Sequence, residues 1–405
     1  MSRFLKIKMR LLSDLSEEEK KSIQETPWDI VIHHGGCPDG VTAAWVVLRS
    51  LDWKPHFYGS EPEVVPYDLW EKLDHNCNLN IIVVDLSFSK EDCDEIHSKC
   101  NKFLIVDHHQ TAARNLSDCD YFIYGGPKNT LSGAGMVKQI YGLDEEKFKF
   151  VNYVSDRDTW QNVLPETKGI NLAMAVEDVF DSPKTVEHFY CTQIVPEPEE
   201  CLNKLAEKGN IYLEYQKRLI GDLLYRMKVV NFHYSNKDKN GDQEDLCFPI
   251  AILNSSVIQS DVANYILRHQ EEIQQLGDEN FPSFKFAIVY TFSDPTVNDG
   301  CGFSIRCEDL YTIEGISTQI GADDIAGLFG GGGHAKAAGF YCSAREFFSR
   351  TSELENNGTK TRTQIQAVGH KQELNLTRMK SILKFIILSL AFAYMSTLIW
   401  NNAVI

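Results

Sequence analysis

The sequence lacks several features that would assign it to a common class. Its 11 cysteines form no C-x-x-C pair, which excludes the usual zinc-finger spacing and suits reduced thiols in the cytosol. Basic residues are few, 40 against 57 acidic ones. The resulting net charge of −17 argues against a protein that wraps long nucleic acid by charge alone. The basic opening, from Met1 to Lys8, has no apolar core of signal-peptide length, so we expect no secretory signal.

What is present is the composition of a large globular protein. With 405 residues, 43% of them hydrophobic and 24% charged, the chain can build more than one core. Strand-like and helix-like stretches alternate at short intervals over its first third. This alternation is typical of βαβ units and predicts a parallel sheet in an α/β fold. In such sheets, ligands bind beyond the carboxyl ends of the strands.

Ionisable residues follow three of the predicted strands, and two further acids end a predicted helix. Because the carboxyl ends of parallel strands meet at one edge of a sheet, we expect these residues to share a site. Imidazole and carboxylate groups together are ligands for a divalent metal. Solvated histidines and ordinary salt-bridged helix caps are the alternatives. The candidate residues are Asp39, Asp85, Asp107, His108, His109 and Asp156.

Two glycine-rich runs suggest close approach by a ligand. The first, His34 to Gly40, joins a strand to a helix, but it contains neither G-x-G-x-x-G nor the Walker lysine, which argues against a nucleotide P-loop. The second, Gly330 to Gly333, precedes His334 and several small residues. Successive N–H groups there can form an anion-binding nest. A flexible linker is the alternative, but a histidine and a strand-like end rarely follow a linker directly.

Taken together, these motifs resemble the DHH phosphoesterase superfamily with its DHH-associated C-terminal domain. The resemblance is to the oligoribonuclease and cyclic-nucleotide phosphodiesterase-like branch, and it extends across residues 28–345. Its most specific element is the intact G-G-G-H-x-x-A-A-G signature that begins at Gly331. The motifs that carry it are His34 to Gly40, Asp85 with its neighbours, Asp107 to His109, Asp156, and Gly331 to Gly339.

The resemblance implies a metal-dependent hydrolase that cleaves phosphodiester bonds of short single-stranded oligonucleotides or cyclic nucleotides. Two divalent ions, usually Mn²⁺ with Mg²⁺ as an alternative, would act at the base of an interdomain cleft by a two-metal mechanism. Asp85 would bridge the two ions, and Asp107 would orient the two histidines. The implied metal ligands are His34, Asp39, Asp85, His108 and Asp156; the catalytic residues are Asp107, His108 and His109; the substrate-binding residues are Arg306, Gly331, Gly332, Gly333 and His334.

Cys37 departs from the family pattern, because many members carry an acid two residues before Asp39. One metal is then a ligand short unless His34 or water takes that place. A branch of oligoribonuclease-like members resembles this cysteine form, so loss of activity does not follow. A pyrophosphatase or exopolyphosphatase, and a non-catalytic, membrane-tethered nucleotide-binding protein, are the alternative functions.

The composition divides the chain into six predicted segments. The uncharged run from Phe385 to Ile405 would be about 31 Å long as a helix, at about 1.5 Å per residue, close to a bilayer core of about 30 Å. Basic residues precede it, so we expect a tail anchor in an intracellular membrane, with the body facing the cytosol. A helix that docks on the enzyme is the alternative. The segments are an N-terminal extension (1–27), the DHH catalytic domain (28–198), a connecting helix (199–229), a smaller α/β substrate-binding domain (230–345), a linker (346–381) and the tail anchor (382–405).

Overall fold

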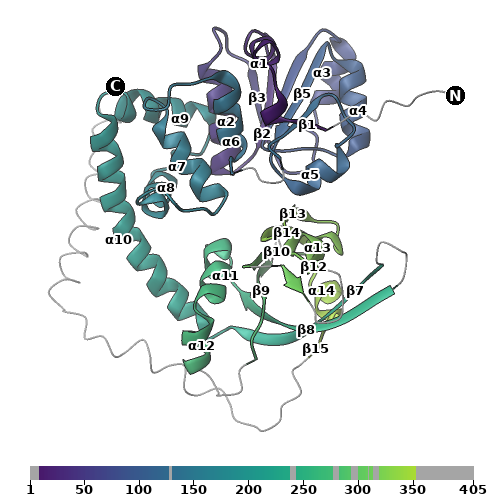
Figure 1. Ribbon diagram of the computed structural model, residues 1–405, viewed down its shortest axis with the longest axis vertical. Coiled ribbons are helices and arrows are strands. Elements are labelled where there is room, and N and C mark those ends of the chain that lie inside the picture. Colours follow the sequence, from purple (N-terminus) through teal and green to yellow (C-terminus); the bar gives the residue numbers. More distant parts are fainter. Residues whose placement is uncertain are drawn as a thin grey trace, which may run out of the picture. The chain divides into compact units, whose positions relative to one another are not determined.

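Two β-sheets organise the chain (Figure 1). One compact unit contains both sheets, and α12 (Gln270–Leu276) belongs to a second unit. The computed structural model describes residues 9–126, 130–237, 243–276, 282–292, 300–308, 310–312 and 319–352.

The first sheet is parallel throughout, as the alternation of strands and helices predicted. Its strands are β1 (Arg10–Leu11), β2 (Ile30–His34), β3 (His56–Ser60), β4 (Asn80–Val84), β5 (Lys102–Asp107) and β6 (Phe122–Tyr124). The order across the sheet is β1-β6-β5-β4-β2-β3. Strands β2 and β4 are neighbours from which the chain proceeds in opposite directions. Ligands of open α/β sheets bind at such a switch point.

Helices cover both faces of this sheet. They are α1 (Glu17–Gln24), α2 (Pro38–Arg49), α3 (Leu69–His75), α4 (Lys90–Lys99), α5 (Gln110–Asn115), α6 (Gly133–Tyr141), α7 (Lys149–Asp158), α8 (Thr167–Val176) and α9 (Pro183–Phe189), with a 3₁₀ turn at Leu12–Asp14 and a π turn at Tyr190–Ile194. Helices α2 and α6 lie on one face, and α3, α4 and α5 on the other (Figure 1).

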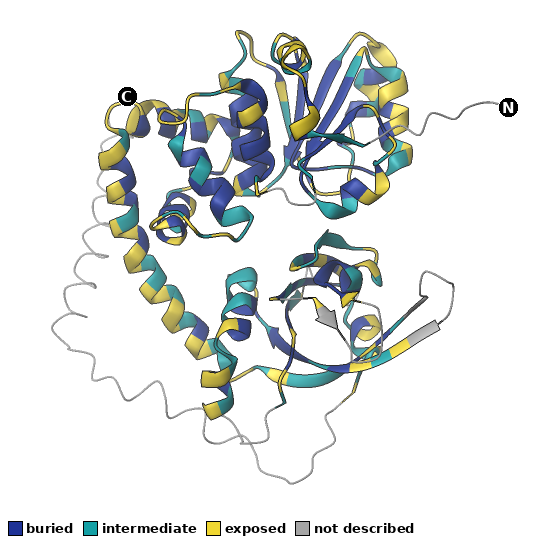
Figure 2. Ribbon diagram, in the orientation of Figure 1, coloured by how far each residue is buried: buried dark blue, intermediate teal, exposed yellow. Residues whose placement is uncertain are grey.

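The central strands of this sheet are apolar at successive positions because helices pack on both of its faces. In β4, Ile81 and Val83 belong to one core cluster, whereas Ile82 and Val84 belong to the other. Successive side chains of a strand point to opposite faces, so a sheet covered on both faces needs continuous apolar runs. Figure 2 shows β2, β4, β5 and β6 buried along almost their whole length.

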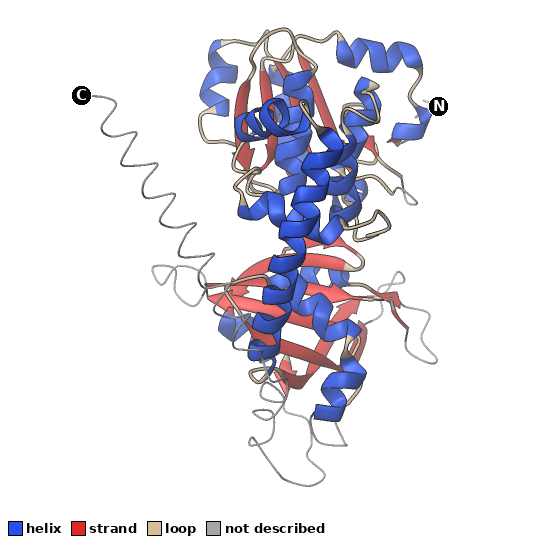
Figure 3. Ribbon diagram, turned by 90° about the vertical axis from the view of Figure 1, so that its left-hand side faces the viewer, coloured by secondary structure: helices blue, strands red, loops and turns tan. Residues whose placement is uncertain are grey.

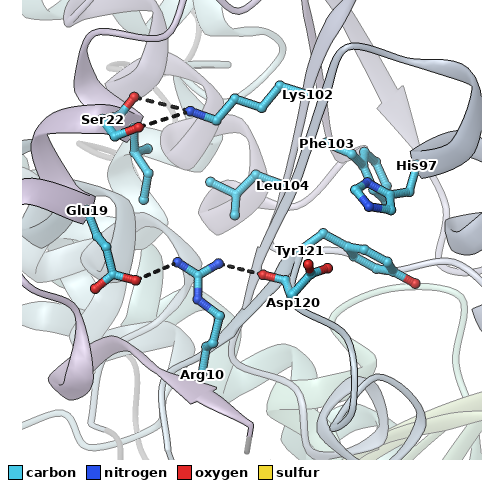
Figure 4. A pocket seen from close by; sticks show the side chains of 10 residues that line it. Arg10, Glu19, Ser22, His97, Lys102, Phe103, Leu104, Asp120 and Tyr121 are labelled. Carbon is cyan, nitrogen blue, oxygen red and sulfur yellow. Dashed lines mark hydrogen bonds and ion pairs between the residues drawn. The ribbon is translucent and has the colours of Figure 1, made fainter. Parts of the chain in front are cut away.

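The N-terminal segment is part of the first sheet. Strand β1 pairs in parallel with β6, and Arg10 donates a hydrogen bond to the carbonyl of Asp120 and pairs with Glu19 at 3.2 Å. Figure 4 shows these contacts at a pocket of about 190 Å³. Among the described residues that line this pocket, none is a predicted site residue. The predicted extension 1–27 therefore includes a strand and a helix that pack on the sheet.

The second sheet is mixed. Only β8 and β9 are parallel among its described strand pairs. Its order is β13-β14-β10-β9-β8-β7-β15 (strands red in Figure 3). The strands are β7 (Lys228–Lys237), β8 (Gln243–Asn254), β9 (Phe286–Phe292), β10 (Gly300–Cys307), β13 (Gly332–His334), β14 (Ala337–Ser343) and β15 (Thr351–Ser352), with a separate ladder of β11 (Tyr311–Thr312) and β12 (Gln319–Ile320) and helices α11 (Gln259–Arg268), α13 (Ala322–Gly327) and α14 (Ala344–Ser349).

The predicted linker begins too early. Residues 344–349 form α14, and β15 pairs with β7, so the second sheet continues past Arg345. The rest of the predicted linker and the predicted anchor, 382–405, lie outside the described residues. Of the helices in the described ranges, none combines the length and apolarity that crossing a bilayer requires.

Helix α10 (Pro198–Leu224) precedes the second sheet and packs on α8 through two glycines. A Cβ at Gly209 would lie 1.9 Å from the carbonyl oxygen of Gly169. We expect Gly209→Ala to lower the free energy of unfolding by about 1–3 kcal/mol or more, because the two helices must separate. Urea unfolding of the purified protein measures this change.

Gly221 provides a matched control on the same helix. A Cβ there would meet no described atom within 4 Å, and the residue is exposed. Gly221→Ala should therefore stabilise the protein by about 0.5–1 kcal/mol through helix propensity alone. Equal effects of the two substitutions would contradict the proposed close contact between α8 and α10.

Candidate metal centre

Three predicted site residues lie where adjacent strands of the first sheet end. His34 is the last residue of β2, Asp85 directly follows β4, and Asp107 is the last residue of β5. Asp85 has a φ of 59°, in the left-handed region that residues other than glycine rarely adopt. Backbone strain of this kind clusters at functional sites. Here it occurs at the switch point of the sheet, at the residue expected to bridge two metal ions.

Asp39 lies in the first turn of α2, which follows β2. Its Oδ1 accepts hydrogen bonds from Ser132 Oγ and from the N–H of Ala134, the latter at 3.1 Å. Its Oδ2 is buried and accepts no hydrogen bond from the described residues. Gly133 permits this close packing, because a Cβ at that position would lie 2.6 Å from Asp85 Cβ.

His108 stands between two acids. Its Nε2 lies 3.1 Å from Asp85 Oδ1 and 3.4 Å from Asp158 Oδ2. His34 Nδ1 lies 3.7 Å from the other oxygen of Asp85. Although His108 is near, Asp85 Oδ1 has no partner with hydrogen-bond geometry in the described part of the chain. Asp85 and Asp39 thus each bury one carboxylate oxygen without a donor, which is costly unless a cation is present.

The negative charge of this centre is only partly compensated. Burial, followed by the charges of Asp85 and Asp158, raises the pKa of Asp39 well above its ordinary value. Burial acts in the same direction on Asp85, but His108 and His34 hold the pKa of that carboxyl well below its ordinary value. Three acids this close disfavour one another's ionisation. A cation would therefore stabilise the fully ionised cluster.

The donor atoms fit a divalent cation. Several groups of three or four donors lie with all their atoms within 4.8 Å of one another. Two of these groups, one around Asp107 and one around Asp158, mix imidazole nitrogen with carboxylate oxygen, a combination that manganese accepts. The residues that would hold the metal are His34, Asp39, Asp85, His108 and Asp158.

Asp156, which the sequence predicted as a metal ligand, belongs to none of these donor groups. Its carboxylate accepts the N–H groups of Val163 and Leu164, each at 3.0 Å, and the hydroxyl of Thr167. These donors satisfy both oxygens and connect the end of α7 to the start of α8. Asp156 is therefore a buried structural carboxylate.

Asp158, the last residue of α7, takes the position predicted for Asp156. It forms one of the candidate ligand groups with Asp39 and His108. Burial and the charge of Asp85 outweigh the nearby His108 and raise the pKa of Asp158 above its ordinary value. In the sequence, the only indication that Asp158 could be a ligand was its position two residues after Asp156 at the end of a predicted helix.

Asp107 contacts both the backbone and the ring of His109. It accepts a hydrogen bond from the N–H of His109 at 3.1 Å, and its Oδ1 lies 2.6 Å from His109 Nδ1. Burial disfavours the charged imidazole, but the charge of Asp107 raises the pKa of His109 to about 10. His109 therefore carries a proton at neutral pH. With Nδ1 engaged, its Nε2–H is the group left to contact a ligand.

The glycine run predicted to hold phosphate as a loop is largely a strand. Gly332 and His334 lie in β13, which pairs with β14, and the N–H of Gly331 donates to the carbonyl of Ala326 at 3.0 Å. Gly331 therefore does not contribute a free donor to an anion-binding nest. Gly332 instead packs on α5, where a Cβ would lie 2.8 Å from Thr111 Cγ2.

His334 reaches the histidines of the first sheet. Its ring centroid lies 4.8 Å from that of His109, in a stacked arrangement, and 4.9 Å from that of His108. Burial, followed by the charges of His109 and His108, lowers the pKa of His334 to about 3. The neutral ring of the G-G-G-H signature is therefore part of the same centre.

Arg306 of β10 lies within electrostatic reach of Asp158, beside Trp160. Its Cζ is 5.4 Å from the Trp160 ring centroid, and Arg157 Cζ is 4.0 Å from the same centroid. Nη2 of Arg306 donates to Ser260 Oγ at 2.6 Å, while its Nε is buried with no partner in the described ranges. Burial, followed by the charge of Arg157, lowers the pKa of Arg306 to about 10.

Arg157 and Trp160 were not predicted as site residues. Arg157 pairs with Asp261 at 2.7 Å. Two neighbouring guanidinium groups, one with a buried unpaired N–H, are a suitable environment for an anion such as phosphate. The sequence placed Arg157 between two acids, where it resembled a member of an ordinary ion pair.

Comparisons with known proteins identify a viral relative and remote structural similarities. No family model matches the sequence. The uncharacterized protein R106 of Acanthamoeba polyphaga mimivirus is 29% identical over 342 residues, which cover 80% of this chain and 70% of that protein. Two solved structures align with most of this chain, but at low sequence identity and low TM-score. One is the pGpG-specific phosphodiesterase PggH from Vibrio cholerae (16% identity, TM-score 0.35, 79% of this chain and 94% of that chain), and the other an uncharacterized protein from Helicobacter pylori G27 (14% identity, TM-score 0.34, 78% and 93%).

Proposed function

We propose that this chain, whose motifs resemble those of the DHH phosphoesterases, hydrolyses phosphodiester bonds of short single-stranded oligonucleotides or nucleotides. The observation that carries the proposal is a buried cluster of acids and histidines, with carboxylate oxygens that lack donors, near two arginines. The acids and histidines suit divalent metal, and the arginines suit a phosphate group. Mn²⁺ is the proposed ion, with Mg²⁺ as the alternative.

The chain's own residues would hold the metal ions and bind and orient the substrate in this reaction. Metal ions, when bound, would supply Lewis-acid activation of the phosphoryl group and of water. Arg306 and Arg157 would hold non-bridging phosphate oxygens and orient the scissile bond. His109, kept protonated by Asp107, would donate from Nε2 to a phosphate oxygen. Asp85 would hold the metal donors on its two sides, His34 and His108, in fixed positions relative to each other.

The net charge supports a small substrate. At −17 the protein repels long polyanions except where cations are concentrated, and long nucleic acid needs many phosphate contacts. A substrate with one or two phosphates needs only the arginine pair. Short oligonucleotides and nucleotides therefore fit better than duplex DNA or RNA.

A substrate panel with the full chain tests the proposal. We would incubate the protein with Mn²⁺ and, separately, with a trinucleotide, a 5′-phosphorylated dinucleotide, a cyclic nucleotide, pyrophosphate and polyphosphate, and measure product release. Hydrolysis of the first three, abolished by a chelator and restored by Mn²⁺, is expected. Release of phosphate from only pyrophosphate or polyphosphate would replace the proposal with the phosphoanhydrase alternative. Failure on every substrate would contradict catalysis.

Arg306→Gln should raise KM for the substrate by roughly 10- to 100-fold, because a charge-assisted contact to phosphate is lost from a buried site. The affinity for Mn²⁺ should change little, since Arg306 is not a metal donor. Arg345→Gln, at an exposed arginine of α14, removes the same charge and should leave KM unchanged. Steady-state kinetics with the best panel substrate measures both. A fall in kcat alone would argue against the binding role.

The sequence also supports a proposal about location. We propose that residues 382–405 anchor the protein in an intracellular membrane with the body facing the cytosol, because an uncharged run follows basic residues. Carbonate extraction of the full chain should leave it in the membrane pellet. A chain truncated after Lys371 should be released. Release of both forms would exclude the anchor.

A further inference from the structure

Cys37 is the one residue of the first glycine-rich turn at which this chain departs from the DHH pattern. It is the N-cap residue of α2, in extended conformation, two residues before Asp39. It is half-buried, and it is not disulfide-bonded. The helix that begins there has 12 residues. Burial, followed by the charge of Asp85, raises the pKa of the Cys37 thiol well above its ordinary value, so a bound cation is needed to displace its proton.

The sulfur of Cys37 lies in a group of possible metal donors. Cys37 Sγ, a ring nitrogen of His34 and a carboxylate oxygen of Asp85 are all within 4.8 Å of one another. This group is separate from the one that Asp39, His108 and Asp158 form, although it adjoins it. Its three donors are of three chemical kinds, namely nitrogen, sulfur and oxygen.

Asp85 provides a second, independent indication of a ligand here. Its side chain is 1% exposed, and its Oδ2 lies 3.7 Å from His34 Nδ1. Its Oδ1 lies 3.1 Å from His108 Nε2 but has no partner with hydrogen-bond geometry among the residues that the structure describes. Its backbone is held at a φ of 59°, a left-handed conformation that residues other than glycine rarely adopt and that occurs often at functional sites. A buried acid in a strained conformation with a spare oxygen points to a cation between Asp85 and its neighbours.

We infer that Cys37 is a metal ligand and that one cation of this centre is bound through the mixed set His34, Cys37 and Asp85. The inference rests on the metal requirement of the proposed function. On binding, the cation replaces the thiol proton, which passes to solvent. Thiolate favours zinc, iron or cobalt over magnesium. The cysteine would therefore compensate for the missing acid and shift the preference of this position toward softer ions.

Cobalt titration of the full, metal-free chain tests the inference without any activity assay. Co²⁺ bound to thiolate absorbs in the near ultraviolet by sulfur-to-metal charge transfer, and Co²⁺ bound by any ligands absorbs in the visible. The wild-type protein should show both absorptions. Cys37→Ser should lose the ultraviolet band and keep the visible bands, because the other donors remain. Cys77→Ser, at an exposed cysteine outside the described donor groups, should match the wild type.

A second variant tests the metal preference. Cys37→Asp restores the acid of the family pattern, and it should lower the ratio of Zn²⁺ to Mn²⁺ affinity by at least roughly tenfold. Competition of each ion with a metal indicator dye measures the ratio. An unchanged ratio would count against thiolate coordination, as would an ultraviolet band that persists in Cys37→Ser.

The outcomes separate this inference from the proposed function. Hydrolysis with Mn²⁺ but no charge-transfer band would refute the cysteine ligand and leave the function intact. A band without hydrolysis of any panel substrate would support the ligand and refute the function. The absence of the charge-transfer band together with failure on every panel substrate would overturn both.

Discussion

Asp158→Asn should reduce kcat/KM by at least about 10³-fold, equivalent to roughly 4 kcal/mol of transition-state stabilisation. Asp158 forms a candidate ligand group with Asp39 and His108, and its Oδ2 lies 3.4 Å from His108 Nε2. An amide keeps the shape but loses the charge that binds a cation. Because the substitution also removes one of three clustered acids, the metal-free protein should be as stable as the wild type or more stable. Kinetics and urea unfolding of the same preparation measure both effects.

Asp156→Asn is the matched control, two residues away in the same helix. Its carboxylate accepts three hydrogen bonds from Val163, Leu164 and Thr167. An asparagine amide presents an N–H group to at least one of these donors, so we expect a loss of about 2–4 kcal/mol of unfolding free energy. Protein that remains folded should keep its metal affinity. If Asp156→Asn loses metal binding and Asp158→Asn does not, the assignment of the two acids must be reversed.

Mn²⁺ should stabilise the wild-type protein against unfolding, and Asp85→Asn should abolish that stabilisation together with at least about 10³-fold of activity. An ion that binds only the folded state adds about 2.7 kcal/mol at a concentration 100 times its Kd. Asp85 adjoins both donor groups through His34 and His108. Asparagine tolerates the left-handed backbone at this position, so the metal-free fold should persist.

Thermal unfolding with and without Mn²⁺ measures this stabilisation. Asp74→Asn serves as the control, because it removes an exposed acid that pairs with Lys99 at the surface. Surface pairs contribute about 0–1 kcal/mol, so this variant should show the full metal-induced shift. An Asp85→Asn protein that Mn²⁺ still stabilises as much as the wild type would place the metal elsewhere.

Local patterns in the sequence were sufficient for the first sheet and for most of its site. Apolar runs such as 81–84 predict strands covered on both faces, and the alternation with helices predicts that they are parallel. The carboxyl ends of neighbouring parallel strands share one edge, so residues that follow those ends are brought together. For this reason the sequence alone indicates that His34, Asp85 and Asp107 lie at one edge of the sheet.

Tertiary structure alone decided which acid of α7 joins that site. Asp156 and Asp158 have the same residue type and flank the same arginine, and the sequence contains nothing that ranks them. The difference between them comes from the hydrogen bonds that Val163, Leu164 and Thr167 donate to the carboxylate of Asp156. These donors come from the segment that follows α7, so the sequence of α7 itself does not predict them.

The second sheet shows the same limit. The glycines before His334 predicted an exposed loop, yet pairing with β14 makes part of the run a strand, and contact with Thr111 explains Gly332. Arg157 became a candidate ligand for phosphate only when Arg306 was found beside the same tryptophan. The sequence determined which residue types were available and which strand ends they follow. Packing between distant segments determined which of these side chains have their hydrogen bonds satisfied by the protein and which remain for a metal or a substrate.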